Sequence, residues 1–399
     1  MRILFVLPYT PNAVRPRAIE TLRALAERGH EISIATLWFT EEERSDLEAL
    51  RAEGFAIFAK PLSRARRVWN RACAVASLRP TDARLCWVPD LTREIDPTGF
   101  DVLHFEHSRS AIFARQLGRR VPTVFDTVDA MSLLNRRALD HWGWRRVGLR
   151  LGWDALTYEE FDASLLHQFP FVTVTSPIDA EALLRLRRNA RSEVTVIPNG
   201  VDLKRFRPPK VPARVPDELV MSGKMTYHPN IAMASQFVSK ILPRIRLRRP
   251  EVRLRVVGEA PTRAVRCLGE HPGVTVVGRV DDLRPDLCRA SLAVATVPYG
   301  AGIQNKVLEA MACATPVVAS TQAASALSAD DETLVVANEP EEIARRCCEL
   351  LDDPARLGKL GIAGRRYVEL EHRWSQLAER FEAVYERAIT HHRRTDRDR

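Results

Sequence analysis

Apolar runs of strand length alternate with amphipathic stretches in the first half of the chain. Between the first two runs, a predicted helix at residues 17–28 has Ile19, Leu22 and Leu25 on one face and ends at Gly29. Strands that alternate with helices are typical of a parallel sheet covered by helices. The first half therefore predicts an α/β domain. Its strands are expected at residues 2–7, 31–37, 101–105, 123–126, 171–175 and 194–197.

The second half repeats this pattern. A stretch rich in proline and turn-forming residues, 197–209, separates the two halves. The fold class that we predict is α/β, with two Rossmann-like domains whose parallel sheets face an interdomain cleft, because open parallel sheets bind ligands at the carboxyl ends of their strands. The strands of the second half are expected at residues 219–222, 253–258, 274–278, 291–297, 317–319 and 332–336.

The expected domain boundaries follow from this division. Residues 1–198 are predicted to form the N-terminal domain and residues 199–371 the C-terminal domain. A last long helix at 372–389 is expected to cross back to the N-terminal domain, and residues 390–399, rich in His and Arg, are expected to be a disordered tail. The apolar residues of this helix recur at helical spacing: Trp374, Leu377, Phe381, Val384 and Tyr385.

Composition places the chain among globular proteins. It has 399 residues, of which 45% are apolar and 28% are charged. No apolar run reaches the about 18 residues that a bilayer span needs, and the short apolar start of the chain reads as a core strand rather than a signal peptide. We therefore expect a cytoplasmic protein. The seven cysteines show no metal-ligand spacing and are expected to be reduced.

A net charge of +9 favours polyanionic partners, and the positive charge is unevenly distributed. Residues 136–153 hold five arginines and three tryptophans, and residues 64–69 form a smaller basic and aromatic patch. Two interpretations stay open. A basic helix with tryptophans can lie on an anionic bilayer, which would place the protein peripherally on the inner face of the plasma membrane. Alternatively, the tryptophans pack on the domain core. A nucleic-acid partner is not expected.

One glycine-containing turn carries more information than any other part of the chain. Gly300 and Gly302 follow a predicted buried strand and allow close approach of a ligand to the backbone. A helix pattern starts near Ile303, and the N–H groups and positive dipole end of its first turn form an anion site. Lys306 and Glu309 lie on one face of this helix. A cation for phosphate and a carboxylate for hydroxyls suit a nucleotide-sugar. The alternative is a solvated surface pair.

Six short stretches occur in order between residues 1 and 389. They are residues 29–32, 196–202, 222–230, 254–258, 277–282 and 302–312. Each stretch is common alone. Their order and spacing together resemble those of a family-4 glycosyltransferase with the two-domain GT-B fold, and the last stretch is most similar to a branch of bacterial exopolysaccharide-type sugar transferases.

The resemblance implies a transferase that moves a hexose from a nucleotide-diphosphate sugar to an acceptor hydroxyl, with retention and without a metal ion or a cofactor. The donor would lie in the C-terminal domain, with Glu309 accepting hydrogen bonds from ribose or sugar hydroxyls, Lys224 near the diphosphate, and Arg279 and Val280 beside the nucleobase. The implied donor-binding residues are Gly223, Lys224, Arg279, Val280, Gly302, Ile303, Gln304, Asn305, Lys306 and Glu309.

The chain departs from the family pattern at two places. The family commonly has two glutamates separated by seven residues, and the second matches Glu309 while the first falls on Ala301. A carboxylate often credited with contacting the donor sugar is therefore missing. The first loop also lacks the glycine pair of many relatives, and Arg15 or Arg17 would supply positive charge there instead.

Candidate residues of the N-terminal domain follow the strands at 101–105 and 123–126. His107 comes just past a strand end and is the candidate that polarises the acceptor or orients the donor sugar, together with Lys306 and Glu309 as the other catalytic candidates. The neighbouring Glu106 is the weaker choice. His104 alternates with apolar residues and is expected to be a core histidine.

Two aspartates past the next strand, Asp126 and Asp129, would either bind acceptor hydroxyls or cap the following helix. No Asp-x-Asp element follows a strand, so no metal site is expected. The acceptor stays undetermined, and a lipid-linked molecule and a growing polysaccharide are both compatible with the sequence.

Other functions stay open at this stage. Two Rossmann-like domains also suit a nucleotide-sugar epimerase, although the C-terminal half offers few of the carboxylates and histidines that such a site needs. The alanine at position 301 is also compatible with a catalytically inactive homologue that binds sugar nucleotides. A nicotinamide dehydrogenase is disfavoured, because no G-x-G-x-x-G motif follows the first strand.

Overall fold

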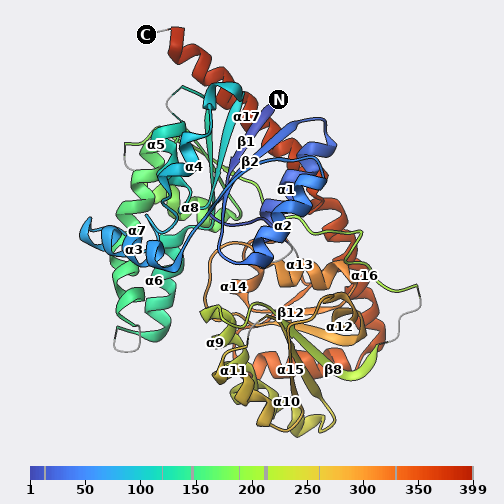
Figure 1. The fold of residues 1–399 in the computed structure, drawn as a ribbon. Helices are drawn as coiled ribbons and strands as arrows, with labels where there is room; N and C mark the ends of the chain where they lie inside the picture. The colour runs from blue at the N-terminus through green and yellow to red at the C-terminus, as the bar shows by residue number, and fades with distance from the viewer. Residues whose placement is uncertain are drawn as a thin grey trace. The chain divides into compact units, whose positions relative to one another are not determined.

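The computed structural model describes residues 1–12, 15–118, 120–144, 148–187, 189–210, 214–259, 261–328 and 330–397. The chain divides into two compact units (Figure 1). Unit 1 comprises Met1–Pro198 and Trp374–Arg399, and unit 2 comprises Asn199–Arg373. Each unit contains one sheet in which all paired strands are parallel, which confirms the predicted α/β class.

The sheet of unit 1 has the strand order β3-β2-β1-β4-β5-β6-β7. Its strands are β1 (Arg2–Val6), β2 (Glu31–Trp38), β3 (Ala56–Pro61), β4 (Val102–Glu106), β5 (Thr123–Val128), β6 (Phe171–Val174) and β7 (Glu193–Val196). The prediction missed β3, a partly buried edge strand whose apolar run, Ala56 to Ala59, is short and ends at Lys60 and Pro61.

The helices of unit 1 connect these strands and cover the sheet. They are α1 (Pro16–Glu27), α2 (Glu41–Ala52), α3 (Arg64–Ala76), α4 (Pro89–Arg93), α5 (Ala114–Leu117), α6 (Met131–Trp142), α7 (Leu149–Gln168), α8 (Pro177–Leu186) and α17 (Trp374–Arg397), with 3-10 turns η1 (Pro97–Gly99) and η2 (Ala111–Phe113). Local signals start several of them. Pro16 occupies the first turn of α1, and the Ser176 hydroxyl caps α8 by accepting a hydrogen bond from the Asp179 N–H.

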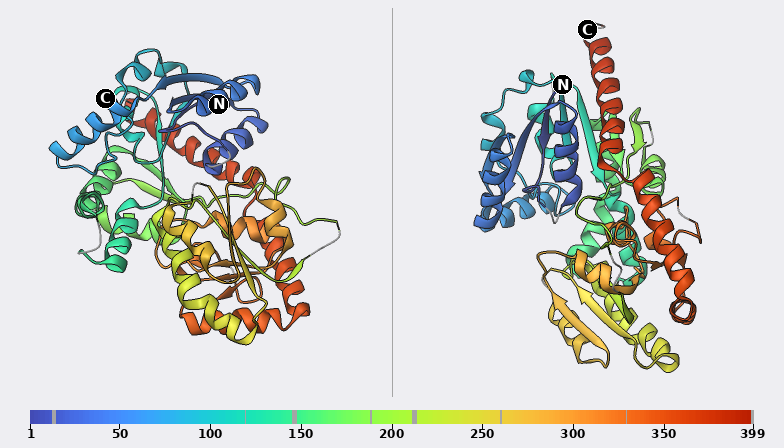
Figure 2. Two further views of the ribbon diagram at one scale, coloured as in Figure 1. Left: turned by 60° about the horizontal axis from the view of Figure 1, so that its bottom comes forward. Right: turned by 90° about the vertical axis from the view of Figure 1, so that its right-hand side faces the viewer.

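Helix α17 packs on α1 and on strands β4 and β5 (Figures 1 and 2). Its apolar face, which includes Phe381 and Tyr385, is fully buried in the core of unit 1. The helix begins at Trp374 instead of 372, because the His372 side chain is held in unit 2 by a 2.7 Å hydrogen bond with the Asn199 carbonyl.

The tail prediction was wrong. Helix α17 continues to Arg397, so residues 390–397 are helical and not disordered. No glycine or proline interrupts this stretch, and two side chains contact unit 1: the His391 ring lies 5.7 Å from the Phe171 ring, and His392 Nε2 lies 3.2 Å from the Arg120 carbonyl oxygen.

The basic segment 136–153 does not form one helix. Helix α6 ends at Gly143, which has a positive φ of 70°, and α7 starts at Leu149, while residues 145–147 lie outside the described ranges. The tryptophans differ in their surroundings. Trp153 donates a 2.8 Å hydrogen bond to the Arg79 carbonyl and packs in the unit, whereas the Trp144 side chain is 57% exposed.

The sheet of unit 2 has the strand order β10-β9-β8-β11-β12-β13. The strands are β8 (Val215–Ser222), β9 (Arg253–Val257), β10 (Val274–Gly278), β11 (Ala290–Ala295), β12 (Val317–Ala319) and β13 (Val335–Val336). The helices are α9 (His228–Gln236), the π-helical η3 (Phe237–Ile241), α10 (Leu242–Arg248), α11 (Arg263–Cys267), the 3-10 turn η4 (Leu268–Glu270), α12 (Arg284–Arg289), α13 (Asn305–Ala312), α14 (Thr321–Ala324), α15 (Pro340–Leu351) and α16 (Pro354–Glu371).

Two glycines let the turns after β8 and β9 approach each other closely. The Gly223 N–H donates a 3.1 Å hydrogen bond to the Val257 carbonyl. A Cβ atom added at Gly258 would lie 1.8 Å from the Gly223 carbonyl oxygen. Since backbone atoms on both sides are held by the sheet, neither turn can move aside, and only glycine fits at position 258.

We predict that Gly258→Ala destabilises unit 2 by about 3 kcal/mol, because the added methyl group overlaps backbone. Chemical denaturation measures this loss. Gly278→Ala is the matched control: its φ is 84°, but a Cβ there meets nothing within 4 Å, so its cost is limited to about 1 kcal/mol of backbone strain. Equal losses in the two variants would contradict the close approach.

Candidate functional site

The strand order reverses at one place in each sheet. In unit 1 the chain moves from β1 towards β3 and then returns to β4 on the other side of β1. In unit 2 it moves from β8 towards β10 and then returns to β11 on the other side of β8. The loops at the carboxyl ends of two such neighbouring strands leave in opposite directions and open a crevice, which is where open α/β sheets bind ligands. Nearly all candidate residues follow these strands.

In unit 2, the turns after β8, β9 and β10 are joined by backbone hydrogen bonds. The Gly258 N–H donates to the Gly278 carbonyl at 2.8 Å, and the Met225 N–H donates to the Glu259 carbonyl at 3.1 Å. Lys224 is exposed beside this framework, and its carbonyl accepts a 3.0 Å hydrogen bond from the Asn230 amide group. The backbone of the turn is therefore fixed while the Lys224 side chain extends into solvent.

Arg279 and Val280, the residues expected beside a nucleobase, follow β10 directly. The Arg279 side chain is exposed, whereas Val280 is partly buried and packs against the core of unit 2. Asp281, which follows Val280, is joined to the first residues of unit 2: Arg205 donates a 3.3 Å hydrogen bond to the Asp281 carbonyl.

The glycine turn after β11 is buried and held by side chains from two other elements. The Tyr299 hydroxyl lies 2.8 Å from His228 Nδ1, at the start of α9, and the two rings stack. Gln322 of α14 donates a 3.2 Å hydrogen bond to the Gly300 carbonyl. Gly302 has a positive φ of 65°, a conformation that favours glycine. The predicted tight turn is present.

Helix α13 starts at Asn305, two residues later than predicted. Ile303 and Gln304 belong to the turn, since Gln304 has an extended backbone with φ −92° and ψ 97°. The Asn305 side-chain oxygen accepts a 2.8 Å hydrogen bond from the Asn199 amide group. The predicted anion site at the start of this helix is thus shifted by two residues along the chain.

Lys306 and Glu309 are partly buried and form no ion pair with each other within the described structure. Lys306 Nζ donates a 2.8 Å hydrogen bond to the Gln304 side-chain oxygen, and its Cε would lie 3.3 Å from a Cβ at Gly223. The ammonium group therefore lies beside the turn after β8. The solvated surface pair, the alternative interpretation, does not describe these two residues.

Burial shifts the pKa values of both groups towards neutrality. It lowers the pKa of Lys306 to about 8, with a small opposing effect of Glu309. It raises the pKa of Glu309 to about 7, against the opposing effects of Lys306 and Arg205. A ligand would change both pKa values. A phosphate anion would raise the Lys306 pKa, and a hydroxyl group that donates a hydrogen bond would lower the Glu309 pKa.

In unit 1, the loop after β1 lies against the end of β4. The Tyr9 hydroxyl donates a 2.6 Å hydrogen bond to Glu106 Oε1, and the Arg15 guanidinium lies 4.2 Å from the centre of the Tyr9 ring. Glu106 is 1% exposed. Burial, and then the negative charge of Asp126, raise the Glu106 pKa to about 7. The sequence analysis did not identify Tyr9. Its position between β1 and α1, past the carboxyl end of a strand, is one where ligand-binding residues are typical in open α/β sheets.

Arg17 and Asp126 form a buried ion pair, so neither is available for the roles considered from the sequence. Arg17 Nε and Nη2 donate to the two Asp126 carboxylate oxygens at 2.6 and 3.0 Å. Arg17 Nη1 also donates to the carbonyls of Ile197 and Pro198. Arg17 is 4% exposed and Asp126 is 1% exposed. The pair therefore joins α1, β5 and the residues that end the Met1–Pro198 segment of unit 1.

Asp129 does not cap α6 and is partly buried. The residue before α6 is Ala130, whose N–H donates a 2.9 Å hydrogen bond to Asp179 of α8. Asp129 accepts a 3.4 Å hydrogen bond from the Thr175 hydroxyl. Burial, and then the charge of Asp179, raise the Asp129 pKa to about 7.

His107 lies past the end of β4, as predicted, and has a left-handed backbone with φ 65°. Its N–H donates a 2.6 Å hydrogen bond to the Asp126 carbonyl, which holds this strained conformation. Nδ1 accepts a 3.3 Å hydrogen bond from the Arg109 N–H, so the remaining proton of the neutral ring is on Nε2. Burial, and then the charge of Arg109, lower the His107 pKa to about 3.

This arrangement makes His107 a hydrogen-bond donor rather than a general base. At neutral pH the ring is uncharged, and its Nδ1 lone pair is already used. The Nε2–H group can donate to a hydroxyl or carbonyl oxygen of a ligand. The sequence predicted that His107 polarises the acceptor or orients the donor sugar. Orientation of the sugar fits this geometry better, because polarisation of an acceptor hydroxyl would need a ring nitrogen that is free to accept its hydrogen bond.

His104, Glu106 and Asp126 offer three ligand atoms within 4.8 Å of one another, the arrangement of a possible metal site. Each of these residues already has a protein partner. The Tyr385 hydroxyl lies 2.9 Å from His104 Nδ1, Tyr9 binds Glu106, and the Arg17 guanidinium binds Asp126. A cation is therefore already present in this cluster, and the donor set does not fit a metal ion. His104 is the core histidine that the sequence predicted.

Family models match the chain over most of its length. The model described as Glycosyltransferase Family 4 matches residues 17–205, and the model described as Glycosyl transferases group 1 matches residues 216–353. This chain belongs to the family-4-like glycosyltransferases with the GT-B fold.

Curated relatives are similar over about half of the chain. A GDP-mannose-dependent monoacylated alpha-(1-6)-phosphatidylinositol monomannoside mannosyltransferase of Corynebacterium glutamicum is 30% identical over 209 residues, which cover 46% of this chain and 54% of the relative. D-inositol 3-phosphate glycosyltransferase 2 of Catenulispora acidiphila is 33% identical over 247 residues, which cover 53% of this chain and 54% of the relative. The chain thus spans about half the length of the curated relatives it matches.

Solved structures share the fold over nearly the whole chain. Sucrose-phosphate synthase of Thermosynechococcus elongatus has a TM-score of 0.70 and 18% identity, with 98% of this chain and 100% of that chain covered. HepE of Anabaena, solved in complex with UDP, has a TM-score of 0.67 and 14% identity, with 97% and 100% covered. None of the described helices combines the length and apolar character that a bilayer crossing requires.

The buried Glu106 carboxyl predicts a pH-dependent stability. Its pKa is about 7 in the folded protein and about 4.5 when unfolded, so the folded state binds the proton more tightly. Stability from this group is therefore complete below pH 4.5 and is lost as the pH rises through 7, on the order of 3 kcal/mol in total.

We expect Glu106→Gln to remove this loss while its side-chain oxygen still accepts the Tyr9 hydrogen bond. Urea unfolding at pH 5 and pH 8 measures the difference between the variant and the parent. Glu31→Gln, at an exposed position of β2, should follow the parent. Parallel curves for Glu106→Gln and the parent would show that Glu106 is not a buried titrating group.

Proposed function

We propose that this protein is a glycosyltransferase that moves a hexose-type sugar from a nucleotide-diphosphate sugar to an acceptor hydroxyl. The observation that carries the proposal is the position of Lys306 and Glu309 on α13, beside the Gly223 turn at the strand reversal of unit 2. A cation and a carboxylate meet there at the start of a helix. The family of the chain supports the same reaction.

In the proposed donor complex, the diphosphate lies at the first turn of α13 and near Lys306. Cleavage of the sugar–phosphate bond leaves negative charge on the diphosphate, and the Lys306 ammonium and the N–H groups of the helix would stabilise that charge. Glu309 would accept hydrogen bonds from donor hydroxyls. These groups supply the stabilisation that a metal ion provides elsewhere, so we propose a metal-independent reaction.

We propose that the reaction retains the anomeric configuration. The bond between the sugar carbon and the phosphate oxygen breaks, the acceptor oxygen bonds to the same carbon on the same face, and the departing phosphate takes the acceptor proton. The neutral His107 ring would then donate a hydrogen bond to a sugar oxygen and need not accept a proton. Unit 1 would bind the acceptor.

Similar proteins support a nucleotide-sugar donor but differ in its base. One curated relative is named as GDP-mannose-dependent, and the HepE structure holds UDP. Ala301 is 6% exposed and cannot contact a sugar through a carboxylate. This position favours a second candidate function, binding of a sugar nucleotide without turnover.

The experiment for the proposed function measures nucleoside diphosphate release. The chain is incubated with a panel of nucleotide-sugars, with and without a small set of acceptor alcohols. Release that increases with an acceptor supports the transferase. Interconversion of the sugars without release would instead indicate an epimerase, and binding without either would favour the inactive homologue.

Donor binding should depend on Lys306 and Glu309. We expect Lys306→Ala and Glu309→Gln to remove the thermal shift that the preferred nucleoside diphosphate produces, while the ligand-free variants stay folded. Lys306 is cationic below its pKa of about 8, so the parent's affinity should fall as the pH rises from 7 to 9.

Titration calorimetry at these two pH values measures that fall, which Lys306→Ala should not show. Lys240→Ala is the matched control, because Lys240 is an exposed lysine of η3 in the same unit. If both site variants bound the diphosphate as the parent does, this helix would not be the donor site.

We also propose that unit 1 contacts an anionic membrane surface. Apolar side chains are exposed on α3, where Trp69 is 65% exposed, and at the start of α7, where Leu149 is 97% exposed. The two regions are neighbours. The pKa of Arg71 in α3 is lowered first by burial and then by the charge of Arg150 in α7, which must therefore lie close to it. Apolar groups among arginines suit the interface of an anionic bilayer.

Sedimentation with phosphatidylglycerol vesicles tests this contact. We expect the double variant Trp69→Glu/Leu149→Glu to lower the bound fraction several-fold, because each glutamate removes an apolar contact and adds a repelled charge. Leu247→Glu is the matched control, since Leu247 is 85% exposed in unit 2. A loss of the same size in the control would contradict a specific contact through unit 1.

A further inference from the structure

A pocket of about 580 Å³ lies in unit 1, away from the strand reversal. One wall is η2 and α5, which lead from β4 back to the start of β5. Another wall is the last two turns of α7, which lead into β6, and the chain after α3 closes the third side. The pocket therefore lies along the helices of the sheet's flank, and neither Tyr9, Glu106 nor His107 lines it.

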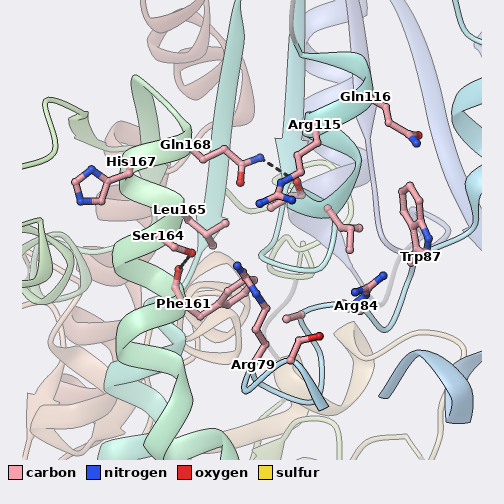
Figure 3. A pocket seen from close by; sticks show the side chains of 14 residues that line it. Arg79, Arg84, Trp87, Arg115, Gln116, Phe161, Ser164, Leu165, His167 and Gln168 are labelled. Carbon is pink, nitrogen blue, oxygen red and sulfur yellow. Dashed lines mark hydrogen bonds between the residues drawn. The ribbon is translucent and has the colours of Figure 1, made fainter. Parts of the chain in front are cut away.

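Arginines from different segments line this pocket. Arg79 and Arg84 come from the chain between α3 and α4, and Arg115 comes from α5. Figure 3 shows their guanidinium groups around the same space, with Arg79 below and Arg115 above. Of the described residues that line the pocket, none is an aspartate or a glutamate.

These guanidinium groups are not neutralised by the protein. In the described part of the chain, no carboxylate forms an ion pair with Arg79, Arg84 or Arg115. By contrast, Arg109 and Arg150 nearby both pair with Asp82. Three cations that converge without a counter-charge repel one another, so an anion that enters the pocket gains an interaction with each of them.

The remaining walls are mixed, with apolar side chains beside polar ones such as Gln116, Ser164 and His167. Trp87, Ile112, Phe161 and Leu165 face the pocket, and the Arg79 guanidinium lies 5.6 Å from the centre of the Phe161 ring. The Gln168 amide is turned to the wall, where it donates a 3.2 Å hydrogen bond to the Ala111 carbonyl (Figure 3). A ligand that fills this space has room for an apolar body as well as a charged group.

A smaller cavity of about 270 Å³ lies next to the pocket. It shares Arg115 and Gln168 with the larger one and reaches Thr123 at the start of β5 and Phe169 before β6. Arg115 therefore lines both cavities. Sites of a few hundred Å³ with apolar walls and a few convergent polar groups are typical of small-molecule binding.

We propose that this pocket binds a phosphorylated molecule with an apolar or aromatic body, with the phosphate held by Arg79, Arg84 and Arg115. The planar guanidinium fork matches phosphate oxygens, and several arginines favour a dianion over a single carboxylate. The ligand chemistry has two possible sources: a soluble phosphate ester or the head group of a lipid. The proposal is independent of the donor site, because no residue is shared with unit 2.

Phenyl phosphate is the probe for the soluble source. Titration calorimetry of the full chain at about 150 mM salt measures its binding, because this salt screens long-range attraction to the positive net charge of the chain. We expect saturable binding that inorganic phosphate competes with and that phenol does not reproduce. Arg79→Gln, Arg84→Gln and Arg115→Gln should each weaken it about tenfold, as expected for the loss of a charge-assisted hydrogen bond. Arg115 is exposed, so its variant tests the site even if the others fold poorly.

Vesicles with and without phosphatidic acid test the lipid source. Capture that requires phosphatidic acid and that the same variants weaken would assign the pocket to a lipid phosphate, even if phenyl phosphate does not bind. Arg185→Gln is the matched control in both assays, because Arg185 is exposed on α8 of the same unit.

Two results would overturn the proposal. One is the absence of saturable binding in both assays. The other is binding that Arg185→Gln weakens as much as the pocket variants do, which would indicate general attraction to a basic surface. The thermal shift with a nucleoside diphosphate should be the same in the parent and in all these variants. If the parent showed no such shift, that result would contradict the proposed donor site and not the pocket.

Discussion

The constraint on which the rest of the structure depends is the reversal of strand order in each sheet. A chain that leaves the central strand in both directions has to separate its loops at one point, between β1 and β4 in unit 1 and between β8 and β11 in unit 2. Backbone groups at these strand ends have no further strand to pair with. The glycine turn before α13 and the strained His107 both lie at such a point.

Charge is distributed differently at the two reversal points. In unit 1 the cation is already neutralised, because Arg17 binds both Asp126 oxygens and two carbonyls. This pair stabilises the framework around His107, whose ring is a partly buried, neutral hydrogen-bond donor. In unit 2, Lys306 and Glu309 have pKa values near neutrality and no ion pair with each other. That difference is consistent with a rigid sugar-binding edge in one unit and a phosphate-binding edge in the other.

The flank of unit 1 adds a third chemical environment that neither reversal point explains. Its arginines are neutralised where Asp82 is available and are not neutralised around the pocket beside α7. Within the described residues these guanidinium groups have no carboxylate partner, so their mutual repulsion opposes their convergence in the isolated protein. The ligand that we propose for the pocket would carry the counter-charge.

The sequence by itself determined the two parallel sheets and the glycine turn, because apolar periodicity and glycine act within a few residues. It also placed Lys306 and Glu309 on one helix face and His104 in the core. Only the tertiary structure decided what each charged group pairs with: Arg17 and Asp126 are 109 residues apart, and the arginines of the pocket come from separate segments. Charge pairing depends on such distant contacts, and a local pattern contains no information about it.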